Sequence, residues 1–155
     1  MSTLQLPPVG HRGLTSNEIL LALRSAHWNN PIAVANKRDF LNLYTESDFV
    51  VATMAGQVYE FEIKISRNDY TRDRLKLRNR IYAREHPGLL PNRFWYVTPP
   101  GIVAAEELPA FAGLIELREG KLVPVRKAPK LHPECHGIEV LMRLARAMRS
   151  RGANG

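Results

Sequence analysis

The stretch YEFEIKISRNDY, residues 59 to 70, alternates apolar and polar side chains with the period of a β-strand. The apolar positions predict the face that packs on a core, and the other face carries Glu62 and Lys64 side by side. Charged residues are common on the solvated face of an edge strand, so the stretch by itself leaves a purely structural role open. The apolar face consists of Tyr59, Phe61, Ile63 and Ile65.

A second strand is predicted directly upstream, over residues 48–53, and the loop 54–57 between the two contains the glycine that a hairpin favours. The expected register places Asp48 opposite Glu62 on one face of the sheet. Like charges that face each other directly destabilise a sheet, so a positive charge is expected between the two carboxylates. A hard divalent cation with oxygen ligands fits this position, with Lys64 as the neighbouring fixed charge.

The remaining elements predict strands flanked by helices. A strand, helix, strand order after the hairpin implies a crossover connection and a parallel pair at the centre of the sheet. Turn residues around Glu119 and Gly120 predict a closing hairpin. The further expected helices span 16–27, 70–84 and about 133–149, and the further expected strands span 32–35, 40–44, 93–98, 113–117 and 121–125.

The order of the charged residues carries a resemblance to a known family. Asp48 on one strand, Glu62-Ile63-Lys64 on the next and a basic helix behind them resemble the PD-(D/E)XK nuclease superfamily. The runs EIKISRNDYTRDRLK, RFWYVTPPGIV, and AGLIEL followed by VRKAPKLH resemble, more narrowly, a group of small phage-associated endonucleases of that superfamily. The resemblance covers roughly residues 18–132, although Ser47 stands where the motif has proline.

This resemblance implies an α/β fold, restriction-endonuclease-like, with a mixed central sheet flanked by helices. It also implies a magnesium- or manganese-dependent endodeoxyribonuclease. Asp48, Glu62 and the carbonyl of Ile63 would hold the cation, and Asp48, Glu62 and Lys64 would form the catalytic set. Lys64 would orient the attacking water and offset developing charge, and it could act as the base if desolvation lowers its pKa.

Glu18 has two interpretations. In nucleases of the kind that the chain resembles, a glutamate of the first helix often completes the metal site, and Glu18 is the only acid in that predicted helix. Thr15-Ser16-Asn17-Glu18 also has the spacing of a capping box, which accounts for Glu18 without a metal. Both roles remain open because a carboxylate near a helix start can cap the helix and still reach a cation.

Basic residues concentrate in two regions. Residues 64–93 contain nine lysines and arginines against three acids, and residues 126–151 contain seven against two. A helix with so many cations is expected to contact phosphates without reading sequence, although a solvated helix with internal ion pairs is the alternative. The residues expected to bind nucleic acid are Arg67, Arg72, Lys76, Arg80, Arg143 and Arg146.

Composition fits one domain over residues 15–150, after an extended arm over residues 1–14. The chain has 155 residues, 45% of them hydrophobic, and its net charge of +7 favours an anionic partner such as DNA. The absence of an apolar run long enough for a membrane span and the single cysteine, Cys135, predict a cytoplasmic protein. A homodimer remains possible from sequence. The competing functional class is a non-catalytic nucleic-acid-binding protein on a nuclease-like scaffold.

His132, Cys135 and His136 are potential zinc ligands close together in the sequence. A closed structural zinc site usually draws its four ligands from two clusters, and the sequence has no second cluster. We therefore do not expect zinc there.

Overall fold

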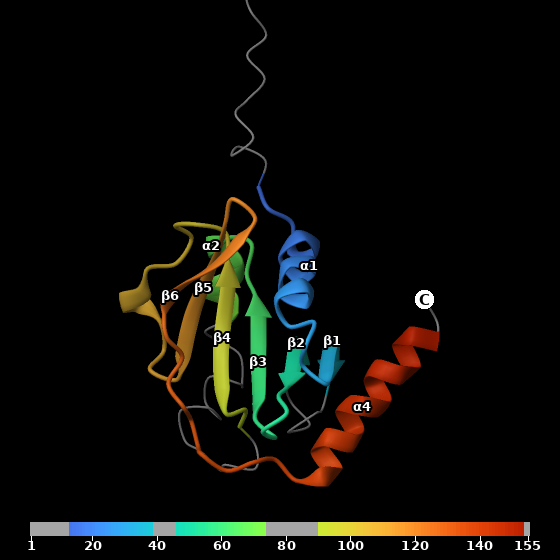
Figure 1. Cartoon of the computed structure of the whole chain (residues 1–155). Coiled ribbons are helices and arrows are strands. Elements are labelled where there is room, and N and C mark those ends of the chain that lie inside the picture. The colour runs from blue at the N-terminus through green and yellow to red at the C-terminus, as the bar shows by residue number, and fades with distance from the viewer. Residues whose placement is uncertain (1–12, 39–45, 74–89, 154–155) are drawn as a thin grey trace, which may run out of the picture.

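The computed structural model describes residues 13–38, 46–73 and 90–153 (Figure 1). Its centre is one six-stranded sheet in the order β1-β2-β3-β4-β5-β6. The pairs β3/β4 and β4/β5 are parallel, and the other neighbours are antiparallel. The strands are β1 Ile32–Arg38, β2 Glu46–Ala52, β3 Val58–Ile63, β4 Arg93–Thr98, β5 Ala112–Arg118 and β6 Lys121–Arg126. The helices are α1 Ser16–Ala26, α2 Arg67–Asp73, the 3-10 helix η3 Ala105–Glu107, and α4 Ile138–Ala153.

This arrangement confirms the predicted α/β fold with a mixed sheet and flanking helices. The hairpin register is also as predicted: Phe49 pairs with Phe61, and Ala52 pairs with Val58. Gly56 makes the turn possible because its φ of +78° is costly for residues with a side chain. The closing hairpin turns at Glu119 and Gly120, which both have positive φ, as the compact hairpin turns require.

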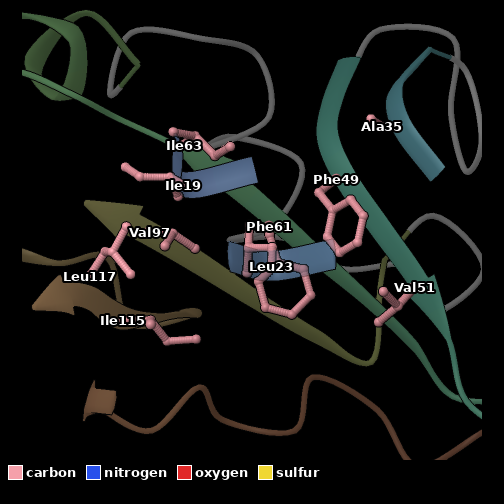
Figure 2. Close-up of a cluster of buried hydrophobic side chains, with 10 residues drawn as sticks. All are labelled: Ile19, Leu23, Ala35, Phe49, Val51, Phe61, Ile63, Val97, Ile115 and Leu117. Atoms are coloured by element: carbon pink, nitrogen blue, oxygen red, sulfur yellow. The ribbon is translucent and has the colours of Figure 1, made fainter. Parts of the chain in front are cut away.

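The first core lies between the sheet and α1 (Figure 2). Ile19 and Leu23 of α1 are fully buried against the face of the sheet that presents Phe49 and Phe61. Burial of each such side chain stabilises the fold by about 1.5–3 kcal/mol. The remaining members of the cluster are Ala35, Val51, Ile63, Val97, Ile115 and Leu117.

The opposite face of the sheet is covered by α2 and α4. Tyr70 of α2 packs edge-on against Tyr96 of β4, with their ring centroids 5.3 Å apart. Leu144 of α4 is fully buried against Val34 and Val58. The sheet therefore has one apolar layer on each side, and the polar residues Glu62 and Lys64 lie on the side of α2 and α4.

The last helix begins later than predicted, at Ile138 instead of Pro133. The reason is Asn92, whose buried side-chain amide donates to the carbonyls of His132 and Glu134 at 3.1 and 2.8 Å. Its side-chain oxygen accepts from the backbone N–H of Val58 at 2.7 Å. These contacts fix residues 131–136 as an extended segment across the end of the sheet, so their carbonyls do not enter a helix.

Other boundaries also differ from the sequence predictions, among them the end of the last helix at Ala153 instead of residue 149. The segment 36–38, expected as a turn, continues β1 because Lys37 and Arg38 pair with β2. The first helix ends at Ala26 instead of His27, and the second begins at Arg67 instead of Tyr70. The expected strand 40–44, the helix beyond residue 73 and most of the N-terminal arm lie outside the described residues. Within the described part of the chain, no helix is long and apolar enough to span a membrane.

Candidate active site

The two strands of the central hairpin stop pairing at Phe49 and Phe61. Beyond this point the carboxylate of Asp48 replaces the strand backbone as the acceptor, and its Oδ2 lies 2.8 Å from the backbone nitrogen of Ile63. On its other side β2 pairs with β1 through Ala35 but skips Asn36, which has a φ of +51°. Asp48 therefore sits at an interruption of the ladder on both sides, and we call this place the fork.

The regular alternation of side chains between the two faces of β2 is also interrupted at the fork. Phe49 faces the core under α1, and strict alternation would place Ser47 on the same face. Instead Ser47 is buried and its hydroxyl donates to Glu60, which lies on the opposite face, at 2.8 Å. The directly opposed pair of Asp48 and Glu62 that the register predicted is therefore not formed.

A cleft of about 200 Å³ opens at the fork on the side of α1. We call it the fork cleft. Asp48 is the one charged residue among those that line it in the described part of the chain. Carboxylate, hydroxyl and amide oxygens are the ligands that hard cations prefer. The lining residues are Ser16, Asn17, Leu20, Asn36, Asp48 and Ile63.

Glu18 does not line the fork cleft. It is exposed at the start of α1, where its backbone nitrogen donates to the Thr15 hydroxyl at 3.2 Å. The same hydroxyl lies 3.3 Å from the Glu18 carboxylate. Thr15 is confirmed as the N-cap, and the Glu18 carboxylate contacts the Thr15 hydroxyl instead of the backbone N–H that a full capping box requires. The role of Glu18 as a metal ligand stays a prediction without support from this arrangement.

Glu62 and Lys64 form a buried ion pair on the side of α2. The Nζ of Lys64 lies 3.1 Å from Oε1 of Glu62 and 3.1 Å from Oδ1 of Asp73. The phenol of Tyr96 donates to the other oxygen of Asp73 at 2.6 Å. A lysine, two carboxylates and a phenol therefore form one hydrogen-bonded cluster, which we call the Lys64 cluster.

The Lys64 cluster keeps the lysine protonated. Burial alone lowers the pKa of a lysine, but here the charges of Glu62 and Asp73, and their hydrogen bonds, outweigh desolvation and raise the pKa of Lys64 above 10.5. The suggestion that desolvation could make Lys64 a base is therefore wrong. Lys64 is a fixed positive charge next to the fork.

Asp48 and Glu62 are neighbours through the backbone of β3. The carboxylate of Asp48 accepts from the amide nitrogen that follows Glu62, while the carboxylate of Glu62 contacts Lys64. Within the described residues, no group of three or more Asp, Glu, His or Cys side chains could hold a metal ion. Asp48 lines the fork cleft on the side of α1, whereas Glu62 contacts Lys64 on the side of α2, so the metal site formed by Asp48, Glu62 and the Ile63 carbonyl stays a prediction.

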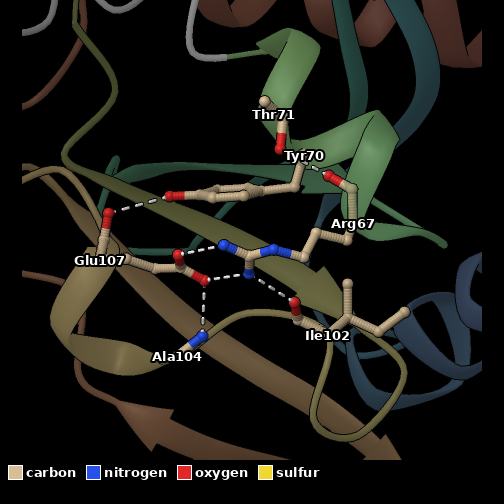
Figure 3. Close-up of polar contacts among 6 residues, drawn as sticks. All are labelled: Arg67, Tyr70, Thr71, Ile102, Ala104 and Glu107. Carbon is tan, nitrogen blue, oxygen red and sulfur yellow. Dashed lines mark hydrogen bonds and ion pairs between the residues drawn. The ribbon is translucent and has the colours of Figure 1, made fainter.

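Arg67, expected to contact phosphate, is committed to a structural ion pair (Figure 3). Its guanidinium donates to both oxygens of Glu107 at 2.6 and 2.7 Å and to the carbonyl of Ile102 at 3.2 Å. The Tyr70 hydroxyl donates to the Glu107 carbonyl, and the Ala104 nitrogen donates to its side chain. These contacts tie α2 to η3, and because the Arg67 side chain is 61% exposed, its contact with nucleic acid stays a prediction.

The other residues expected to bind nucleic acid fall into two groups. Arg72 is exposed on α2, and Arg143 and Arg146 are exposed on α4. Lys76 and Arg80 lie outside the described residues. The nucleic-acid contacts of both groups remain predictions.

Asp73 is the member of the Lys64 cluster that the sequence prediction missed. It is fully buried and contacts both Lys64 and Tyr96. A signal was present, because Asp73 follows the buried Tyr70 by three residues and the helical period places both on one face. An acid on the buried face of a helix needs a partner, and Lys64 is a candidate cation in the same stretch of sequence.

Comparisons with known proteins give information on the fold and not on the function. No family model matches the chain, and no curated protein matches it. One solved structure is similar over 97% of this chain and 90% of its own length, with a TM-score of 0.58 and 20% sequence identity. It is the SPO1766 protein of unknown function from Silicibacter pomeroyi.

Proposed function

We propose that the protein is a metal-dependent nuclease that hydrolyses DNA phosphodiester bonds at the fork. The observation that carries the proposal is the placement of Asp48: its carboxylate is held on the Ile63 amide, one residue from the Glu62–Lys64 ion pair. This is the order of groups that the sequence resemblance implies for such a centre. A magnesium or manganese ion would be held by Asp48, Glu62 and the carbonyl of Ile63.

The side chains of the fork have separate roles in this proposal. When bound, the cation would polarise a phosphoryl oxygen and lower the pKa of a bound water. The Ile63 amide orients Asp48 toward the fork cleft, so little conformational entropy remains to be lost when ligands bind. Lys64 supplies a positive charge for the charge that develops on the phosphate, and Asp73 and Tyr96 fix its position.

A protein that only binds nucleic acid is the competing account. A pure binder gains nothing from Asp48 in the fork cleft, because a carboxylate repels phosphate there. The other lining residues in the described part of the chain carry no charge that would offset this repulsion. An acid whose described neighbours in the cleft are uncharged therefore favours a metal centre over a phosphate pocket.

The test is cleavage of linear, single-stranded, flapped and branched DNA with Mg²⁺ or Mn²⁺. We expect divalent-dependent cleavage by the wild type and a loss of about 100-fold or more in Glu62→Gln, because the amide keeps the size of the side chain and removes the metal-binding charge. Glu116→Gln is the matched control. Glu116 is also a buried carboxylate, but it lies on β5, where it contacts the Gly101 amide and Arg118.

Equal cleavage by wild type and Glu62→Gln would refute the assignment of Glu62. A wild type that is inactive on every substrate with both metals, while it still binds DNA, would support the non-catalytic alternative. A loss of activity in Glu116→Gln as large as that in Glu62→Gln would mean that lost stability explains both results.

A further inference from the structure

A second hollow lies at the other end of α1, between α1, the edge strand β1 and α4. Its volume is about 350 Å³, larger than that of the fork cleft. Four lining residues come from the end of α1 and the turn after it, namely Arg24, His27, Trp28 and Asn30. The other walls are residues 33–35 of β1 and Met148 of α4. We call this hollow the Trp28 groove.

Most of the surface of Trp28 is exposed to solvent. Its exposed fraction is 83%, although a packed tryptophan is among the largest contributors to a core. Its neighbour His27 shows the contrast, because the His27 ring packs on Phe61 with centroids 5.1 Å apart. A single exposed apolar residue is common, but here it forms the lip of a groove and offers a flat aromatic face.

Among the described residues that line the Trp28 groove, Arg24 is the charged one, and further arginines lie on α4 beside the groove. The described part of the two bordering helices carries Arg24 on α1 and Arg143, Arg146 and Arg149 on α4, all exposed, while Glu18 and Glu139 lie in the first turns of these helices. Burial lowers the pKa of His27, so this histidine adds no positive charge at neutral pH. The surface therefore attracts a polyanion and repels a second copy of itself. A nucleic-acid strand has the complementary charge, and its bases are flat rings that stack on indole.

The Trp28 groove and the fork cleft lie along one side of α1. Ser16 and Leu20 line the fork cleft, and Arg24 and Trp28 line the groove. Ser16, Leu20 and Arg24 are four positions apart, which places neighbouring members of this series on one stripe of α1, and Trp28 lies two residues beyond the end of the helix at Ala26. The stripe from Ser16 to Arg24 is about 12 Å long at 1.5 Å per residue. An extended nucleic-acid strand of a few nucleotides can span this distance.

We propose that the Trp28 groove binds single-stranded nucleic acid, with one base stacked on the indole of Trp28 and the adjacent phosphates near Arg24 and the arginines of α4. The strand then continues along α1 toward Asp48. The proposal rests on the proposed nuclease function only for the fate of the bound strand at the fork. Binding itself does not depend on catalysis.

The test is fluorescence anisotropy of a labelled oligo-dT with EDTA present, so that cleavage does not interfere. We expect Trp28→Ala to weaken binding about 5- to 150-fold, the range that corresponds to stacking of one base on an aromatic ring. Trp28→Phe should recover part of the affinity. The matched control is Leu21→Ala, which removes a 60% exposed apolar side chain of α1 outside the groove lining and should leave affinity unchanged.

A second readout separates stacking from a general loss of structure. Oligo-dT should quench the emission of exposed Trp28, and Trp28→Phe should lose this signal because only Trp95 then remains. Wild-type affinity in Trp28→Ala, or no quenching in the wild type, would overturn the proposal. A wild-type dimer that Trp28→Ala converts to monomers would also overturn it, because the groove would then bind a second copy.

Different results would refute the groove proposal and the nuclease proposal. If Trp28→Ala weakens binding but no protein variant cleaves DNA, the groove stands and the nuclease proposal falls. If cleavage depends on Glu62 while Trp28→Ala binds and cleaves like the wild type, the nuclease stands and the groove proposal falls.

Discussion

Replacement of Lys64 by methionine tests how much the ion pairs of the Lys64 cluster contribute to the free energy of unfolding. The change keeps most of the side-chain volume and withdraws the ammonium that Glu62 and Asp73 both contact at 3.1 Å. The side chains of these three residues are at most 8% exposed, so water cannot take the place of the lost charge. Removal of one partner from a buried ion pair costs about 3–5 kcal/mol, and we expect a loss of unfolding free energy in this range.

The assay is urea unfolding followed by circular dichroism at neutral pH. Arg67→Met is the matched control, because it removes a cation from the exposed ion pair with Glu107 and should have a much smaller effect. Asp73→Asn in the Lys64→Met background should recover part of the loss, since it removes one of the two negative charges. If Lys64→Met costs no more than Arg67→Met, the cluster does not hold the fold as argued.

Two further predictions concern the segment that closes the end of the sheet. Asn92→Ala removes three hydrogen bonds, including that to the Val58 N–H, and should lower the free energy of unfolding by about 3–5 kcal/mol. The control is Asn68→Ala on the exposed side of α2, which should change the free energy of unfolding little. Equal urea midpoints for the two variants would contradict this role of Asn92. Burial and the nearby His132 lower the pKa of the His136 imidazole to about 4. Because the unfolded chain then binds a proton at His136 more readily than the folded chain, the free energy of unfolding should fall as the pH drops from 6.5 to 4. The expected decrease is roughly 2 kcal/mol after allowance for solvent screening. His136→Gln should flatten this part of the stability profile, and an unchanged profile would show that other groups cause it.

The fold could be predicted where one local signal determined the structure. Alternation in residues 59–63 identified the face of β3 that packs under α1, and the glycine of the 54–57 loop predicted the hairpin register. The opposite face of β3, with Glu60 and Glu62, is buried as well, and Ile65, predicted on the apolar face, is exposed beyond the end of the strand. The turn at Glu119 and Gly120 was equally local. These predictions needed no knowledge of other parts of the chain.

The details of the candidate site depended on distant contacts. Asp48 lies where the ladder to β1 skips Asn36, and the turn predicted at residues 36–38 marked this position without showing that β1 continues beyond it. The start of the last helix depends on Asn92, about forty residues upstream, whose amide captures two carbonyls of the connecting segment. Local propensity around Pro133 favoured a helix start, and the tertiary hydrogen bonds outweighed it.

The central claim is that the fork hydrolyses DNA through the carboxylate of Asp48. The measurement that tests it most directly is the single-turnover rate of Mn²⁺-dependent DNA cleavage in the wild type and in Asp48→Asn. The asparagine oxygen can still accept from the Ile63 amide, so the variant should keep the local structure and lose only the charge. We expect cleavage by the wild type and a rate that is lower by at least about 100-fold in Asp48→Asn. Equal rates in the two proteins, or no cleavage by either, would contradict it.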